Sequence, residues 1–305
     1  MDMLATLRSF GLVAQTGSFT RASHLAGVSQ PTLSRQIREL EQHFGVRLFR
    51  RTTRALTITE DGRTLLAHAR QMLDTLEDAE TALGRHKGAA RGLVRLGLPT
   101  ALGLHLAARV QDLLGRHPAL SIEFVMRDAF GDMTAEGLDL AVRLGLPSEE
   151  TLIVRHLWDI ERVLVASPAY LCRAAPPASP ADLANHACIA YTYGRSRPDW
   201  TFSSQRQTAT VPAGGQFRAN NSEAVHVAAL AGSGIALLPI YQVRADLLAG
   251  RLRRLLPGWQ AAALSFQATY PAQRSLPQRT RVVLDYIASL PSAEFSATSE
   301  GQAGP

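Results

Sequence analysis

The sequence predicts a multidomain protein of the α+β and α/β classes, with a small helical N-terminal domain, a long connecting helix and a larger α/β part. Three observations predict this organisation. Short helical patterns separated by glycine fill residues 3–44, and a heptad-like apolar stripe begins near residue 65. Beyond residue 92, strand-like and helix-like runs alternate, which is typical of α/β domains.

Length and charge are consistent with several domains, one of them basic. The chain has 305 residues, of which 46% are hydrophobic, enough for two or three cores. Its formal net charge is +6 and its pI about 9.9. Residues 1–60 alone carry eight arginines and four carboxylates, a net charge of +4. This local excess favours a polyanionic partner for the N-terminal domain.

The first two helices are delimited by small residues. An apolar stripe predicts a helix over 3–15, which Gly17 ends. A second helix is predicted over 19–26, with Ser18 as its N-cap and a turn beginning at Gly27.

The third helix, which begins after Ser29, has one apolar and one polar face. Pro31 lies in its first turn, where a missing N–H costs little. The apolar face consists of Leu33, Ile37, Leu40 and Phe44. The opposite face carries Arg35, Arg38 and Gln42, flanked by Thr32 and Ser34. Such a helix can be held against the DNA major groove, and the alternative is a solvated arginine face.

Two short strands are predicted after this helix, over 48–51 and 55–59, and together they form a wing. Arg50, Arg51 and Arg54 belong to this wing. Arginines at such a position can follow the DNA backbone or enter the minor groove.

A long helix is predicted to follow, with Thr59 as its cap. Its apolar stripe, in steps of four and three, consists of Leu65, Ala69, Met72, Leu76, Ala79 and Leu83. Heptad spacing predicts a dimerising helix, and the alternative is an amphipathic core helix. A second stripe, Leu66 and Leu73, is expected to pack on the protein's own first helix.

The remaining chain is predicted to form an α/β domain with mostly parallel strands. The predicted strands are 93–98, 120–126, 138–144, 163–167, 188–191 and 235–239. The predicted helices are 102–114, 223–231 and 278–290. Two hundred residues are generous for one sheet, so two lobes with a cleft between them are expected. The small, polar segment after Leu290 is expected to fray.

Several classes of function lack support in the sequence. Cys172 and Cys188 form no CxxC motif, and inert thiols are expected. No nucleophile elbow, P-loop or HExxH motif is present, and the nine histidines lack metal spacing. We therefore expect no enzyme activity, cofactor or metal. Without a signal peptide or an apolar run of about 20 residues, a cytoplasmic location is expected.

The sequence resembles the LysR-type transcriptional regulators over essentially its whole length. Residues 7–62, LRSFGLVAQTGSFTRASHLAGVSQPTLSRQIRELEQHFGVRLFRRTTRALTITEDG, resemble that family's winged helix-turn-helix. The segments that resemble its effector domain are DLAVRLG, VASPAYL, DLANHACIAY, ALAGSGIALLP and ATYPAQRSLPQRTRVVLDYI. They look closest to the branch that includes CrgA-like regulators.

The resemblance implies a winged helix-turn-helix over 1–59, a linker helix over 60–88 and an effector domain over 91–293. The effector domain would have two lobes like those of periplasmic binding proteins. Lobe I would comprise 91–162 and 267–293, lobe II 163–266, and a flexible tail 294–305. The chain would cross between lobes near 163–167 and return near 264–270.

The resemblance also implies the DNA-contacting residues. Gln30, Thr32, Ser34 and Arg35 match the family's base- and phosphate-contacting positions. Glutamine can pair bidentately with adenine and arginine with guanine. The full expected set is Ser29, Gln30, Pro31, Thr32, Ser34, Arg35, Arg38, Arg50, Arg51 and Arg54.

The implied effector site lies between the lobes. Its expected residues are Pro99, Thr100, Asp128, Ala129, Phe130, Arg143, Arg218, Asn220 and Asn221. Thr100 precedes a helix N-terminus, and arginine can bind a carboxylate bidentately, so the expected effector is a small organic acid. The alternative is that Arg143 and Arg218 form structural ion pairs.

The expected function is sequence-specific binding of promoter DNA by a homodimer or homotetramer. A small anionic effector is expected to control this binding, and a contact with RNA polymerase is possible for such a regulator. A solute-binding or sensor protein that uses its N-terminal helices only for assembly is the alternative. Such a periplasmic protein would need a signal peptide, and it would have no need of Arg50 and Arg51.

Overall fold

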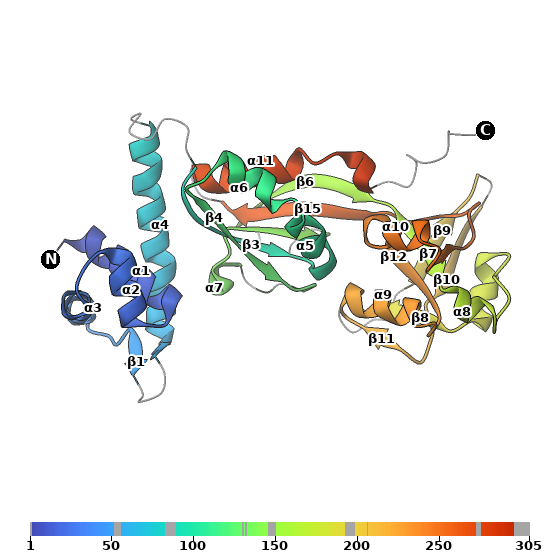
Figure 1. Ribbon diagram of the computed structural model, residues 1–305, viewed down its shortest axis with the longest axis horizontal. Helices are drawn as coiled ribbons and strands as arrows, with labels where there is room; N and C mark the ends of the chain where they lie inside the picture. The colour runs from blue at the N-terminus through green and yellow to red at the C-terminus, as the bar shows by residue number, and fades with distance from the viewer. Residues whose placement is uncertain are drawn as a thin grey trace. The chain divides into compact units, whose positions relative to one another are not determined.

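The computed structural model describes residues 2–51, 56–82, 90–129, 131, 133–145, 151–192, 199–205, 207–272 and 276–295. The chain divides into two compact units (Figure 1). The first comprises the N-terminal 89 residues with 132–137, which hold α7 (Met133–Glu136), and 273–278. The second holds both α/β lobes. No helix in the described part of the chain is long and apolar enough to span a membrane.

The N-terminal helices have the predicted caps. They are α1 (Met3–Thr16), α2 (Phe19–Ala26) and α3 (Gln30–Phe44). The Ser18 and Ser29 hydroxyls accept hydrogen bonds from the backbone N–H groups of Arg21 and Thr32, both at 3.3 Å. Gly27 ends α2 with a φ of 65°, a left-handed conformation that favours glycine.

The wing is also confirmed. It consists of β1 (Phe49–Arg51) and β2 (Leu56–Ile58), paired antiparallel. Phe49 is buried, and its ring meets that of Phe10 edge to face, with centroids 5.5 Å apart. This aromatic contact joins the wing to the core formed by α1, α2 and α3.

The apolar face of α3 is one residue shorter than predicted. Leu33, Ile37 and Leu40 are buried, but Phe44 is 45% exposed. The prediction for Phe44 is wrong because it is the last residue of the helix, where the chain turns away at Gly45.

The predicted apolar stripe of the linker helix α4 (Glu60–Ala82) has two parts with different surroundings. Leu66 and Leu73 pack on the N-terminal core, as predicted. Leu65 and Ala69 pack there too, and Ala69 is 1% exposed, so Ala69 has no surface left for a partner. Met72 is 56% exposed, which leaves only the later part of the stripe open to a partner. Leu83 lies outside the described residues.

Lobe I is a five-stranded sheet in the order β4-β3-β5-β15-β6. Its strands are β3 (Gly92–Leu98), β4 (Leu120–Met126), β5 (Leu140–Leu144), β6 (Leu152–Ile160) and β15 (Leu264–Pro271). Its helices are α5 (Thr100–Ala107), α6 (Val110–Arg116) and α11 (Gln278–Ala288). The single predicted helix over 102–114 is therefore two, which meet at Ala108 and Arg109.

Lobe II has a five-stranded sheet in the order β11-β8-β12-β7-β13 and a three-stranded sheet β10-β9-β14. The strands are β7 (Arg162–Ala166), β8 (Cys188–Tyr191), β9 (Asp199–Ser203), β10 (Thr208–Pro212), β11 (Arg218–Ala219), β12 (Ile235–Pro239), β13 (Arg253–Arg254) and β14 (Gln260–Ala261). Its helices are α8 (Pro168–Leu171), η1 (Pro180–Asn185), α9 (Ser222–Leu230) and α10 (Ile240–Leu248).

The prediction of mostly parallel strands is wrong. The pairs β3–β4, β3–β5, β8–β11 and β8–β12 are parallel. The other strand pairs in the described structure are antiparallel. In lobe I this arises because β15 returns from lobe II antiparallel to both β5 and β6. Figure 1 shows β6 and β15 side by side, with β6 leading toward lobe II and β15 returning from it.

The crossovers lie next to each other. The chain leaves lobe I at Glu161, between β6 and β7, and returns at residues 262–263, between β14 and β15. The Arg162 Nε–H donates to the carbonyl oxygen of Ala262 at 2.7 Å and ties the crossovers together. Burial lowers the pKa of the Arg162 guanidinium. We call these two crossovers the hinge.

The expectation that the chain frays after Leu290 is wrong for four residues. Ser292–Phe295 forms a 3₁₀ helix, η2, and Phe295 is 1% exposed. A single aromatic side chain that finds a buried position outweighs the small, polar composition around it.

Candidate DNA-binding surface and inter-lobe site

The polar face of α3 is open to solvent in the N-terminal unit. Gln30, Pro31, Arg35 and Arg38 are exposed, and Thr32 and Ser34 are half-buried. The face thus presents arginine and amide donors on a rigid helix whose other side is fixed in the core. A helix of this kind fits the B-DNA major groove, which is about 12 Å wide.

Several of the predicted DNA-contacting side chains already have partners at or on the helix, among them Arg38, whose Nε donates to the Ser34 carbonyl oxygen at 3.3 Å. Ser29 is exposed, and its hydroxyl lies 2.9 Å from that of Thr32, in addition to capping the helix. The Nε of Arg35 lies 3.7 Å from a carboxylate oxygen of Glu39, one turn along. Both side chains of this pair are well exposed, so a DNA base or phosphate can replace Glu39 at little cost.

The wing contributes Arg50, which is exposed on β1. Arg51 follows it in the strand, and the side chain of Arg51 and the whole of Arg54 lie outside the described residues. Their expected DNA contacts stay predictions.

Glu41 holds the wing to α3, a role that the sequence did not predict. One of its carboxylate oxygens accepts hydrogen bonds from the backbone N–H groups of Leu48 and Phe49, at 2.9 and 3.4 Å. The other lies 3.2 Å from Arg47 Nη1. No local pattern marks this role, because the backbone N–H groups that Glu41 accepts are seven and eight residues away.

The second candidate site lies between the lobes, where one carboxylate meets two helix N-termini. Asp128 follows β4 in lobe I, and its Oδ1 accepts a hydrogen bond of 2.8 Å from the Thr100 N–H. Its Oδ2 accepts one of 2.9 Å from the Ser222 N–H. These N–H groups belong to the first residues of α5 and α9, so the Asp128 carboxylate lies at the positive ends of both helices.

Asn221 adds a second link between the lobes. Its Nδ2 donates to the Thr100 hydroxyl at 3.0 Å, while its Oδ1 caps α9 by accepting from the Ala224 N–H at 3.1 Å. The structure thus brings together three of the residues expected at the effector site, namely Thr100, Asp128 and Asn221.

The other expected effector-site residues take no part in the hydrogen bonds described above. Pro99 is the N-cap of α5, Ala129 is exposed and Phe130 lies outside the described residues. Arg218 and Asn220 are exposed at or just after the edge strand β11. Arg143 lies in β5 opposite Gln267 of β15, with its Nε and Nη2 atoms buried.

Tyr241 belongs to the surroundings of this site and was not predicted. Burial raises the pKa of its phenol, and the nearby carboxylates of Asp128 and Glu223 raise it further, as does Tyr191. The phenol is therefore neutral and keeps its proton as a hydrogen-bond donor. Glu223 Oε1 in turn accepts a hydrogen bond of 2.8 Å from Gln242 Nε2.

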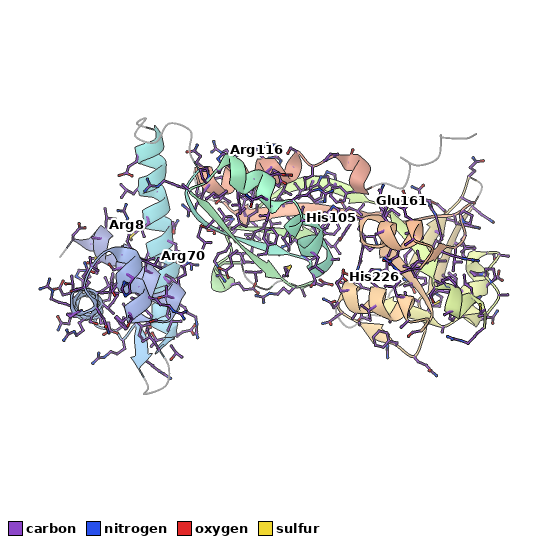
Figure 2. The ribbon with its side chains drawn as sticks, in the orientation of Figure 1. Arg8, Arg70, His105, Arg116, Glu161 and His226 are labelled. Atoms are coloured by element: carbon purple, nitrogen blue, oxygen red, sulfur yellow. The ribbon has the colours of Figure 1, made fainter. Side chains whose placement is uncertain are left out.

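A buried ionic cluster clamps α9 to α10 behind the site. The Asp246 carboxylate lies 2.7 Å from His226 Nε2 and 2.6 Å from Arg251 Nε. The side chains of Asp246 and His226 are only 7% and 13% exposed. Figure 2 labels His226 on α9. The clamp fixes the direction of α9, and with it the Ser222 N–H that reaches Asp128.

Comparisons with known proteins agree over most of the chain. Residues 87–291 match the model of the LysR substrate binding domain, and residues 4–63 match that of the bacterial regulatory helix-turn-helix protein, lysR family. The chain is similar to the HTH-type transcriptional regulator PtxR of Pseudomonas aeruginosa, with 36% identity over 282 residues, 92% of this chain and 90% of that one.

Two further relatives are similar over nearly their full length. The HTH-type transcriptional activator AaeR of Escherichia coli is 30% identical over 292 residues, 94% of this chain and 93% of that one. The structure of CrgA, a LysR-type transcriptional regulator from Neisseria meningitidis, matches with a TM-score of 0.59 and 28% identity, covering 93% of this chain and 97% of that one.

Proposed function

We propose, starting from the fact that this chain belongs to the LysR family of transcriptional regulators, that a small organic acid bound between its lobes controls its binding to promoter DNA. The N-terminal unit carries the helix-turn-helix, and the second unit is the effector-binding domain.

The Asp128 carboxylate is the observation that carries the choice of an acid. It lies between the N-termini of α5 and α9 and accepts a backbone N–H from each. Backbone N–H groups at a helix start and the helix dipole both favour an anion. The carboxylate of an effector can accept the same two hydrogen bonds if Asp128 turns away.

Exchange of one carboxylate for another also supplies a means of control. A ligand shifts a conformational equilibrium only when it binds two states unequally. Asp128 is tied to lobe I through the chain, whereas an effector is tied to neither lobe. An effector that replaces Asp128 at Ser222 therefore changes the coupling between the lobes.

On the DNA side, Gln30, Thr32, Ser34 and Arg35 are proposed to read bases and phosphates, with Arg50 and Arg51 on the backbone. A homodimer or homotetramer would hold two such helices about 34–36 Å apart, in successive major grooves of an interrupted palindrome. The exposed Met72 side of α4 is available for pairing with a second copy. We place this regulator in the bacterial cytoplasm at the nucleoid, with a contact to RNA polymerase as part of the proposal.

A matched set of ligands tests the effector class on the full chain. Acetate, succinate and benzoate are compared with acetamide, succinamide and benzamide, by thermal unfolding and by footprinting on DNA selected by the protein from a random library. We expect at least one acid, and not its amide, to raise Tm and alter the footprint. Stabilisation by an amide as strong as that by its acid would contradict an anionic effector.

A further inference from the structure

A buried aromatic side chain near the C-terminal end lies directly on the hinge. Phe295, from η2, is 1% exposed and packs against Trp158 with ring centroids 4.6 Å apart. Its ring also lies 5.8 Å from that of Tyr241 and 5.9 Å from that of His105. His105 and Tyr241 themselves lie 5.2 Å apart, so the four rings form one cluster.

The members of this cluster come from both lobes. Trp158 belongs to β6 and His105 to α5, both in lobe I, whereas Tyr241 belongs to α10 in lobe II. Phe295 comes from neither sheet. Its ring is the one that touches all three of the others, so its position depends on the angle between the lobes.

The backbone makes the same connection. The Phe295 carbonyl oxygen accepts a hydrogen bond of 3.0 Å from the N–H of Glu161, the residue at the first crossover. The Glu161 carbonyl oxygen accepts one of 2.9 Å from the N–H of Ile240, the first residue of α10. The Glu161 carboxylate lies 3.0 Å from Arg254 Nη2 in lobe II. Figure 2 labels His105 on α5 and Glu161 at the crossover.

We propose that η2 is a strap across the hinge, with Phe295 as its anchor, and that it restricts the angle between the two lobes. A ring packed in a dense cluster resists movement of its neighbours, because displacement opens a cavity. A change in lobe angle separates Tyr241 from Trp158 and His105 and so has to dislodge Phe295. Release of the strap broadens the range of lobe angles.

Spin labels can measure that range in the full chain. Cys172 is exposed in lobe II and Cys188 is buried, so Gln111→Cys in α6 of lobe I completes one label pair. Labelled protein is diluted with an excess of unlabelled protein, so that only distances within one chain are observed. The background protein is compared with Phe295→Leu and with a variant that ends at Pro291.

Two controls separate the strap from general stability. Phe202 is equally buried, at 1% exposure, but lies in the core of lobe II, so Phe202→Leu matches the point variant. A variant that ends at Ala297 keeps Phe295 and matches the truncation. All variants are checked for folding by circular dichroism.

We expect Phe295→Leu and the Pro291 truncation to broaden the distance distribution at least twofold in width. Phe202→Leu and the Ala297 truncation should leave it as in the background protein. An unchanged distribution in the folded Pro291 truncation would overturn the proposal, as would equal broadening in Phe202→Leu.

Discussion

The Asp128 carboxylate of lobe I accepts a hydrogen bond of 2.9 Å from the Ser222 backbone N–H at the start of α9 in lobe II. The two residues are 94 positions apart in the chain, and the same carboxylate also accepts the Thr100 N–H. One side chain therefore satisfies donors at two helix N-termini and joins the lobes.

Replacing Asp128 by alanine should lower stability by about 1–3 kcal/mol, because two helix-terminal N–H groups lose a charged acceptor. Acetate should then recover part of the loss in Tm, relative to chloride at equal ionic strength, since a free carboxylate can occupy the vacated position. Thermal unfolding of the full chain measures both effects.

Asp182→Ala provides the matched control. The Asp182 carboxylate also accepts two backbone N–H groups, from Ala178 and Ser179 at 2.9 and 2.8 Å, but it does so at the start of a single short helix, η1, in lobe II. Acetate should not recover its Tm, because no pair of helix N-termini meets there. The same recovery in both variants, or none in Asp128→Ala, would show that the inter-lobe position does not select a carboxylate.

Removal of Arg35 and of Arg51 should weaken DNA binding in different ways. Arg35→Ala should lose about 1–3 kcal/mol of preference for the selected sequence, since a bidentate base contact disappears. Arg51→Ala should weaken binding to all sequences and reduce the salt slope by about 1, since a phosphate contact disappears.

Gel shifts on selected and scrambled DNA at several salt concentrations measure these losses. Arg116→Ala is the control, because Arg116 is exposed on α6 of the second unit, labelled in Figure 2, and should leave binding unchanged. If Arg35→Ala keeps the full preference for the selected DNA and Arg51→Ala keeps the affinity and salt slope of the parent, these assignments are refuted.

Local signals account for what could be predicted. Serine caps at Ser18 and Ser29 and the threonine cap at Thr59 satisfy N–H groups within three residues, so the starts of α2, α3 and α4 follow from the sequence. The strands β8 and β12 are short apolar runs, and β4 begins with alternating apolar and polar residues; all three occur as predicted.

Tertiary contacts account for what could not be predicted. The bridge from Asp128 to Ser222 and the contact of Phe295 with Trp158 join distant segments, and no local pattern records them. The strand β6 was not predicted, because it shows no regular alternation of buried and exposed residues. It is an edge strand, and four successive residues, from Ile153 to His156, are exposed. The family resemblance placed Asp128 near the effector site. Only the folded structure shows that its carboxylate accepts hydrogen bonds from the N-termini of two helices.

The Asp246 clamp predicts an acid-sensitive part of the stability. Burial raises the pKa of the Asp246 carboxyl, but hydrogen bonds from Arg251 and His226 and their charges lower it, and the net pKa lies below the ordinary value of 3.8. A lowered folded pKa stabilises the protein above the unfolded pKa, and this contribution disappears as the pH falls through the folded pKa.

Asp246→Asn should therefore destabilise the protein at pH 7 by about 1–3 kcal/mol, because the buried carboxylate loses its charged hydrogen bonds to His226 and to the partly exposed Arg251. As the pH falls through the lowered folded pKa of Asp246, the variant and the parent should converge, because the parent's carboxyl becomes protonated. Urea unfolding at a series of pH values measures the difference. Asp285→Asn, in the exposed pair with Arg155, should cost less than about 1 kcal/mol. An equal effect of the two variants at pH 7 would refute the role of the clamp.

The two cysteines should differ sharply in reactivity. Burial raises the pKa of the Cys188 thiol to about 11, and its Sγ lies 3.6 Å from the Leu183 carbonyl oxygen. Cys172 is exposed. Because the thiolate is the reactive form, a disulfide reagent at pH 8 should modify one thiol per native chain quickly and the second only after denaturation. Cys172→Ser should abolish the fast reaction of the native chain and leave the reaction of Cys188 that follows denaturation. Two fast thiols in the native parent would show that the core around β8 opens readily, and would contradict the burial of Cys188.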